Sequence, residues 1–280
     1  MNLDLSETQI LLGDTLGEFL DREVPFSRIR SIDAAGSWDQ DLWEVLVERG
    51  WLALPFQEAL GGGGGSLLEA GILVEKLSRR AVVVPLVEVL AAALTLQQFA
   101  EPQPVEALIR GVIEGSAIPV PSLLESSDRF DRVALEADAD GSLRGEKFFV
   151  DYGQFATHHL VAARNREGPG LYLVDVRHAS VKQEPLHSIG RTPQAIVRYD
   201  RVPAQLLCGS DGLAQLIRLG RAFASVQCLA LMEQALEMTV AYASLREQFG
   251  RPIGSFQAVQ HHCANMATLV ESARFLVYEA

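Results

Sequence analysis

The sequence predicts an α+β fold with an N-terminal α-helical domain, a middle antiparallel β-barrel domain and an incomplete C-terminal α-helical bundle. Three observations predict this order. Apolar residues recur at helical spacing through the first third of the chain, the pattern changes to short alternating segments near Ser116, and helical spacing returns near Leu213. We place the domain boundaries at residues 1–115, 116–210 and 211–280, with the last domain truncated.

Capping signals mark the first helices. Ser6 followed by Gln9 predicts a capping box at the start of the chain, and Gly50 predicts the end of a second helix. A phosphate-binding loop needs a lysine after its glycines, and none follows Gly61–Gly65. We therefore interpret this glycine run as a flexible turn before another helix.

Short alternating segments predict the strands of the middle domain. They are residues 133–137, 145–150, 159–163, 171–175 and 195–199. Helix-length patterns between them are missing, which disfavours a Rossmann sheet and suits an antiparallel barrel or sandwich. One long helix then spans Gly212 to Arg246, and a last helix starts near Phe256. This helix is still periodic at Ala280, without a stop signal.

Composition excludes several classes of function. The net charge of −12 argues against a nucleic-acid partner. The three cysteines, an odd number without a CxxC pair, argue against a disulfide framework or a zinc site. No secretory signal is present, and the longest apolar run, Ala81–Leu96, contains Pro85 and Glu88. We interpret that run as a buried helix, and we expect a cytoplasmic protein without a membrane span.

The segment after the long helix carries the most specific motif. Residues 246–257 read REQFGRPIGSFQ, which resembles the RxxFGxxIxxFQ signature of the acyl-CoA dehydrogenase family. Four further segments resemble family motifs in the right order: Leu54–Gly62 (LPEEYGG), Glu75–Arg79 (EELGR), Gly145–Val150 (GxKxWI) and Tyr199–Gly209. Together these segments cover nearly the whole chain. The overall sequence is most similar to small or accessory-type bacterial subunits of the family.

The resemblance implies a flavoprotein oxidoreductase of fatty acid or lipid catabolism. Its reaction would be FAD-dependent α,β-dehydrogenation of an acyl-CoA thioester. In the family, FAD lies between the β-domain and the C-terminal helices, and a neighbouring subunit grips its ADP half. We therefore expect a homo- or hetero-oligomer with another acyl-CoA dehydrogenase subunit. An electron-transfer flavoprotein would be the electron acceptor.

The same resemblance assigns the cofactor-binding residues. Arg246 matches the arginine that contacts the FAD pyrophosphate, a role that suits a permanently charged, bidentate guanidinium. Gln248 matches a contact with the same phosphates, Phe249 packs beside the cofactor, and Gln257 matches the glutamine at the adenosine end. The alternative is a solvated arginine beside a tight turn.

Two positions depart from the family pattern. The flavin-contacting TEPxxGSD stretch is here Ser122–Asp128, in which Leu124 replaces the flavin-binding threonine and only Glu125 matches cleanly. Asp151 replaces a hydroxyl that normally donates to the flavin ring. An ionised carboxylate accepts but does not donate, and it would oppose the negative charge of reduced flavin.

The catalytic residue stays unknown. Removal of the α-proton needs a positioned carboxylate. Most of the family places this glutamate beyond residue 280. A minority places it just before the arginine matched by Arg221, and that position is Gly220 here. Glu233 and Glu237 lie three to four turns further along, so we do not nominate them. Either the chain is a piece of a longer enzyme, or it is a degenerate subunit that pairs with a complete homologue.

Other functions are weaker hypotheses. The chain is alternatively a non-catalytic structural partner in a heteromeric dehydrogenase, or a flavin oxidase or monooxygenase of the same fold. We expect no metal site, because the neighbours in His158–His159 and in His261–His262 point to different faces. No hydrolase motif is present.

Overall fold

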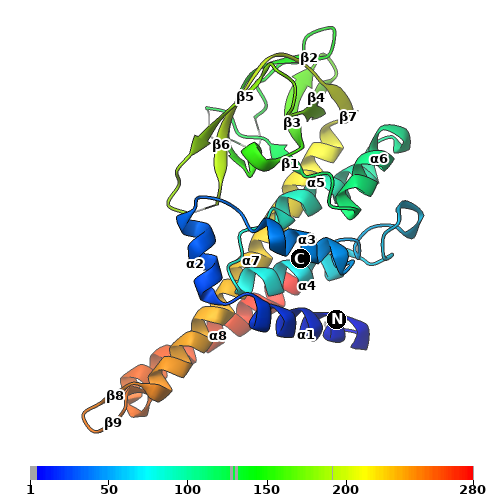
Figure 1. Ribbon diagram of the computed structural model, residues 1–280. Helices are drawn as coiled ribbons and strands as arrows, with labels where there is room; N and C mark the ends of the chain where they lie inside the picture. The colour runs from blue at the N-terminus through cyan, green and yellow to red at the C-terminus, as the bar shows by residue number, and fades with distance from the viewer. Residues whose placement is uncertain (1–4, 127–128, 130–131, 191, 280) are drawn as a thin grey trace. The chain divides into compact units, whose positions relative to one another are not determined.

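Helices come first along the chain, strands follow, and two long helices come last (Figure 1). The computed structural model describes residues 5–126, 129, 132–190 and 192–279. The first helices are α1 (Glu7–Glu23), α2 (Phe26–Ala34), α3 (Gln40–Glu48), the short 3-10 helix η1 (Glu58–Leu60), α4 (Leu67–Arg79), α5 (Leu86–Phe99) and α6 (Pro102–Ile113). The predicted α+β class is confirmed.

The middle of the chain forms two sheets. The strands are β1 (Pro119–Ser122), β2 (Ser142–Asp151), β3 (His158–Asn165), β4 (Gly168–Asp175), β5 (Val181–Leu186), β6 (Gln194–Pro203) and β7 (Gln205–Cys208), with a short 3-10 helix η2 (Gly153–Phe155). One sheet has the order β1-β3-β4-β7 and the other β2-β6-β5. The predicted strand at residues 133–137 is reduced to two isolated pairings, Glu136 with Arg164 in β3 and Ala137 with Leu143 in β2. These pairings link the two sheets into one β-region.

One strand pair differs from the antiparallel expectation. β1 runs parallel to β3, with Pro119 opposite His158, whereas the other pairs among the described strands are antiparallel. A parallel pair needs a long crossover. The chain provides one, because it passes through β2 of the other sheet between β1 and β3.

Local chemistry explains the starts and turns of the helices. Ser6 and Gln9 form the predicted capping box, and Gly50 takes a left-handed φ of 72° just after α3. The glycine run is a turn, as expected, but a tightly built one. A Cβ on Gly62 would lie 2.2 Å from the carbonyl oxygen of Phe56, so only glycine fits there.

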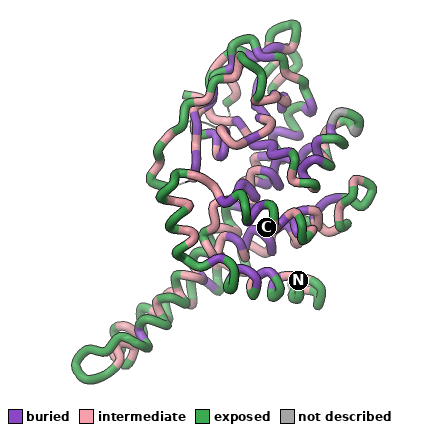
Figure 2. The backbone as a smooth tube through the Cα atoms, in the orientation of Figure 1, coloured by how far each residue is buried: buried purple, intermediate pink, exposed green. Residues whose placement is uncertain are grey.

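The last elements are long and carry a short hairpin between them. They are α7 (Ser210–Leu245), β8 (Glu247–Gln248), β9 (Arg251–Pro252), the 3-10 helix η3 (Ile253–Ser255) and α8 (Gln257–Glu279). Fewer residues are buried along this part of the chain, where Figure 2 shows mostly residues of exposed and intermediate burial. In α8 the side chain of Val270 is buried, while Leu276 is 68% exposed.

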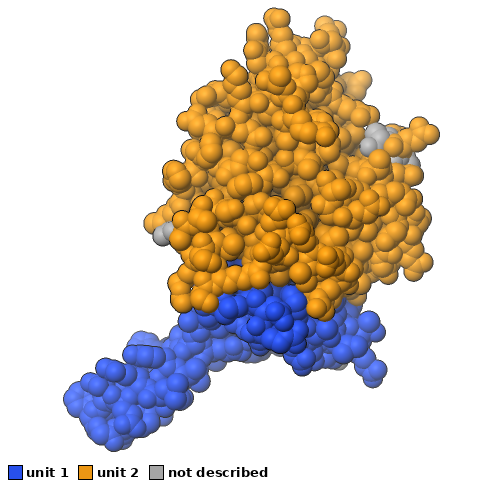
Figure 3. All heavy atoms as spheres, viewed as in Figure 1, with its two compact units in different colours: residues 1–26, 71–82, 222–280 blue, residues 27–70, 83–221 orange. Residues whose placement is uncertain are grey.

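The chain divides into two compact units, coloured separately in Figure 3. Unit 1 comprises residues 1–26, 71–82 and 222–280, and its core joins α1, the end of α4 and α7 through side chains such as Leu16, Leu73 and Phe223. Unit 2 comprises residues 27–70 and 83–221 and holds the sheets. The boundaries between the three predicted domains stay a prediction. Across the residues described, no helix is long and apolar enough to span a bilayer.

Candidate cofactor and active site

The predicted cofactor residues lie on and beside one short hairpin of unit 1. Arg246 follows α7, β8 and β9 pair antiparallel, and Gln257 begins α8. Phe249 and Gly250 form the turn between the strands, with φ of 54° and 76°. Two left-handed residues are what a type I′ hairpin requires. The spacing of the sequence motif therefore has a backbone cause, and the structure brings the four predicted residues to one tip.

This tip presents donors and an aromatic ring outward. Phe249 is 92% exposed, and its ring meets Phe256 edge-on at 6.1 Å. The guanidinium of Arg251 lies over Phe256, 4.2 Å from the ring centroid. Among the described residues, Arg246 makes no ion pair, and Gln248 donates only to the neighbouring carbonyl of Glu247, at 2.7 Å. The tip thus has cationic and amide donors to offer to something outside its unit.

The chemistry of this donor set fits the phosphate half of FAD. A pyrophosphate carries negative oxygens that a free guanidinium and amide groups recognise by hydrogen bonds. An exposed aromatic ring supplies an apolar surface beside them. Contact between FAD and Arg246, Gln248, Phe249 or Gln257 remains a prediction.

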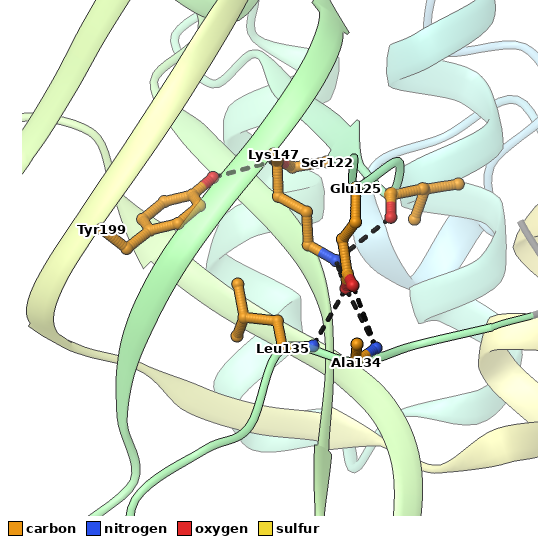
Figure 4. A network of polar contacts seen from close by, with 7 residues as sticks. Ser122, Glu125, Ala134, Leu135, Lys147 and Tyr199 are labelled. Atoms are coloured by element: carbon orange, nitrogen blue, oxygen red, sulfur yellow. Dashed lines mark hydrogen bonds and ion pairs between the residues drawn. The ribbon is translucent and has the colours of Figure 1, made fainter. Parts of the chain in front are cut away.

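A buried ion pair holds the segment that resembles the flavin loop in unit 2. The ammonium of Lys147, which is fully buried, lies 2.6 Å from Glu125 and donates to the carbonyl of Leu123 at 3.1 Å (Figure 4). Glu125 also accepts from the backbone amides of Ala134 and Leu135, at 3.1 Å and 3.0 Å. The Glu125 carboxylate therefore links the segment after β1 to Lys147 of β2 and to the backbone of residues 134–135.

Electrostatics keep this pair charged. Burial favours the neutral acid, but the bonds from Lys147 and from the two amides outweigh it, so the pKa of Glu125 is lowered. Burial also lowers the pKa of Lys147, and the bond to Glu125 opposes that shift. Glu125, the residue that matches the family stretch cleanly, is thus a structural anchor. Residues 127–128, at the end of that stretch, lie outside the described residues.

Leu124 stands where the family pattern has a flavin-binding threonine, and its side chain cannot form a hydrogen bond. Its carbonyl accepts from the amide of Phe148 at 2.9 Å, which continues the pairing of this segment with β2. The backbone position is therefore kept while the hydroxyl is lost.

Asp151 lies at the end of β2, in a strained stretch of backbone. Phe149 and Tyr152 both have left-handed φ, 52° and 53°, although neither is glycine. The register of β2 against β6 shifts between Lys147 and Val150. Gln194 of β6, which pairs with Asp151, donates from Nε2 to its Oδ1 at 2.7 Å. Such strained positions cluster at functional sites.

A second carboxyl group, on α5, feels the charge of Asp151. Glu88, in the first turn of that helix, has a pKa raised to about 8, first by burial and then by the charge of Asp151. Burial likewise raises the pKa of Asp151. No motif pointed to Glu88 or Gln194. The available signal was a single charge in the otherwise apolar run 81–96.

Gly220 itself supplies no carboxylate at the second family position. Arg221 is exposed on α7, and a Cβ built on Gly220 meets no heavy atom within 4 Å. The catalytic residue therefore stays unknown within the described residues.

The acids further along α7 are engaged in ion pairs within unit 1. Glu233 is buried and pairs with Arg274 and, at 3.8 Å, with Arg79. Glu237 pairs with Arg79 as well. These contacts indicate a structural role for both glutamates.

The paired histidines do not assemble a ligand set. His159 is buried, and its ring nitrogens bond the carbonyl of Gly153 at 3.1 Å and the hydroxyl of Tyr199 at 3.0 Å. Burial lowers its pKa to about 4, so the ring is neutral. In the part of the chain that is described, no group of three or more His, Cys, Asp or Glu side chains is placed to hold a metal ion.

Known proteins share both the sequence and the fold. Residues 6–116 match the model of the acyl-CoA dehydrogenase N-terminal domain, and residues 210–280 match that of the C-terminal domain. The acyl-CoA dehydrogenase IpdE2 of Mycobacterium tuberculosis is 29% identical over 276 residues, covering 98% of this chain and 76% of that protein.

Two solved structures are similar throughout. A variant of the Tcur3481–Tcur3483 steroid ACAD is 30% identical, with a TM-score of 0.92, covering 98% of this chain and 76% of that one. The ChsE4–ChsE5 complex of Mycobacterium tuberculosis is 26% identical with a TM-score of 0.92, covering 100% of this chain and 78% of that one. Sequence, fold and domain matches agree, and the chain belongs to the acyl-CoA dehydrogenase family.

Proposed function

We propose that this chain is one subunit of an oligomeric acyl-CoA dehydrogenase that carries out FAD-dependent α,β-dehydrogenation of an acyl-CoA thioester. The observation that carries the proposal is the hairpin tip, where Arg246, Gln248, Phe249 and Gln257 stand exposed together. Its donors have no strong partner among the described residues, and their chemistry suits a pyrophosphate. A cytoplasmic location is part of the proposal.

The roles of the residues follow from their chemistry. Arg246 binds the phosphates, the amides of Gln248 and Gln257 orient the nucleotide, and Phe249 covers an apolar surface beside it. Lys147 and Glu125 fix the backbone of the loop on the β-domain side. When bound, FAD supplies the acceptor for the hydride that leaves the β-carbon. An electron-transfer flavoprotein is the expected electron acceptor.

The α-proton requires a base that residues 1–280 do not offer at the two family positions. That base comes either from a part of the enzyme outside residues 1–280 or from a complete homologue that pairs with this chain. The Tcur3481–Tcur3483 and ChsE4–ChsE5 structures are named for two proteins each, which supports a heteromeric partner. The likeness to a steroid ACAD makes steroid-derived acyl-CoA thioesters the first substrate class to test.

The first test is the visible absorbance of the purified chain, alone and mixed with a homologous subunit. We expect the band of oxidised flavin in at least one of these samples. The variant Arg246→Met should lose bound flavin roughly tenfold or more, since a charged hydrogen bond is removed. Arg22→Met removes an exposed arginine of α1 (side chain 67% exposed) and is the control.

The outcomes separate the alternatives. Flavin in the single chain supports a site that one kind of subunit builds. Flavin only with the partner supports the heteromer. Colourless protein in both samples contradicts the cofactor assignment. Oxygen consumption during turnover would instead indicate the oxidase or monooxygenase function.

A further inference from the structure

Arg251 lies on the β8–β9 hairpin of unit 1 and is not one of the four residues predicted to bind the cofactor. It pairs directly with Gln248 across the two strands, and side chains paired in this way lie on the same face of a hairpin. The ladder continues by one step, because the amide of Ile253 donates to the carbonyl of Arg246 at 2.8 Å. Side chains alternate between the two faces along a strand. Arg246, Gln248 and Arg251 therefore share one face of the hairpin, and Glu247 lies on the other.

This face of the hairpin carries two positive charges that no described residue neutralises. Arg246 and Arg251 are both exposed, and neither guanidinium makes an ion pair within the described residues. The two positions are diagonal neighbours on the ladder, and such neighbours lie roughly 7–8 Å apart. Two long side chains at this spacing reach a single anion between them. Because like charges repel at such a distance, the face favours a ligand that carries negative charge.

Aromatic rings hold the guanidinium of Arg251 in place. It lies over Phe256, 4.2 Å from the ring centroid, and Phe249 meets the same ring edge-on at 6.1 Å. A cation over a ring is held by the electron density of the ring face. This contact occupies no hydrogen-bond acceptor, so the N–H groups of the guanidinium stay available to a ligand. The side chain is also restricted before any ligand arrives, which lowers the entropy cost of binding.

We infer that Arg251 is a second phosphate-binding residue, and that Arg246 and Arg251 together bind the diphosphate of FAD. The inference rests on the proposed function. Each phosphate of that diphosphate carries one negative charge near neutral pH, so two guanidiniums balance its charge, whereas Arg246 alone leaves one charge unpaired. Guanidinium groups bind phosphate oxygens with two parallel hydrogen bonds. Phe256 is then a positioning residue, which acts through the guanidinium of Arg251.

The affinity of single variants for FAD tests the role of Arg251. Flavin fluorescence gives the dissociation constant, in whichever sample binds flavin, the single chain or its mixture with the homologous subunit. Arg251→Met keeps an apolar stem against Phe256 but removes the charge, so the dissociation constant for FAD should rise roughly tenfold or more. Arg251→Lys should give a smaller rise, since an ammonium keeps the charge but not the paired hydrogen bonds. Arg22→Met, at an exposed arginine of α1, should leave the constant unchanged.

Salt dependence and a double variant separate a phosphate contact from a purely structural one. Salt screens exposed charges, so raising the ionic strength from about 0.05 M to about 0.5 M should weaken FAD binding by the unmodified chain more than by Arg251→Met. Phe256→Leu should weaken binding too, but less so in the Arg251→Met background, because the guanidinium that the ring positions is already absent. Strictly additive losses would overturn the positioning role of Phe256.

The failure of this inference is distinguishable from the failure of the proposed function. If Arg246→Met loses flavin while Arg251→Met binds FAD as the unmodified chain does, the inference is overturned and the proposed function stands. Equal salt dependence in the unmodified chain and in Arg251→Met overturns it as well. If FAD binds neither the single chain nor its mixture with the homologous subunit, the proposed function and the role of Arg251 are overturned together.

Discussion

The β-region of unit 2 and the α7–α8 tip of unit 1 differ in which groups they bury: the β-region buries a charged side chain, whereas the tip exposes an aromatic ring. In the β-region a lysine is wholly buried, and its charge is met by Glu125 at 2.6 Å. At the tip an aromatic ring, Phe249, is 92% exposed, and the Arg246 guanidinium makes no ion pair with a described residue. In the β-region the buried charge has a partner within the same region, whereas at the tip the exposed cationic side chains have no ion-pair partner among the described residues.

The difference indicates which parts of the chain form all their interactions without a binding partner. A buried charge without a partner costs several kcal/mol, so the β-region needs its ion pair in order to fold. An exposed aromatic and a solvated arginine cost little, but they add nothing to folding either. Residues of the second kind are best explained by something that binds them.

The largest expected effect is on the buried pair. Lys147→Met removes the ammonium and leaves Glu125 without its main partner, so the free energy of unfolding should fall by about 3 kcal/mol. Chemical denaturation measures it. Lys147→Met combined with Glu125→Gln should recover part of the loss, because no buried charge is left.

The control is a pair on the surface of the same β-region. Arg198 and Glu146 lie 2.6 Å apart but are 51% and 44% exposed. Arg198→Met should therefore cost less than about 1 kcal/mol. Equal losses for Lys147→Met and Arg198→Met would contradict the contrast between buried and exposed charge.

A smaller effect concerns pH. The pKa of Glu88 is raised to about 8 by burial and by Asp151, so between about pH 5 and 8 the folded chain binds more protons than the unfolded chain. Its contribution to stability is full below the unfolded pKa and is lost as the pH rises through 8. Thermal or chemical unfolding should show a decline of about 1–3 kcal/mol over this range.

Glu88→Gln should flatten that decline. Glu184→Gln removes an exposed glutamate of β5 (61% exposed) and should keep the slope of the unmodified chain. If Glu88→Gln retains the full slope as well, another group is responsible and Glu88 does not hold the extra proton.

Sequence patterns predicted the elements that carry local chemistry. The capping box at Ser6 and the left-handed Gly50 after α3 were readable because cap residues act within a few positions. The break after α7 was expected as a tight turn, and its short β8–β9 hairpin was not predicted. Elements without such signals were missed. α2 buries no residue, β1 contains two prolines, and β5 is largely exposed, so none shows the expected apolar period.

The candidate site was readable to the same extent. The four hairpin residues belong to one continuous motif, so their proximity follows from the chain itself. Glu88 and Asp151 are far apart in sequence, and the effect of the charge of Asp151 on Glu88 depends on the folded structure. The pKa of each is raised by burial, and at Glu88 also by the charge of Asp151, and no local sequence pattern encodes these influences.

The smallest expected effect on stability, and the sharpest test of the comparison, is at Phe249. Phe249→Ala should change the free energy of unfolding by less than about 0.5 kcal/mol, because the side chain is exposed. Phe249→Gly should stabilise the free chain by up to about 1 kcal/mol, since glycine accepts the φ of 54° without strain. Both variants should nevertheless weaken flavin retention in the assembled enzyme. A side chain that lowers the stability of the free chain, and whose removal weakens only ligand binding, belongs to a binding interface. A Phe249→Ala chain that unfolds more easily but binds flavin normally would place the ring in the chain's own core instead.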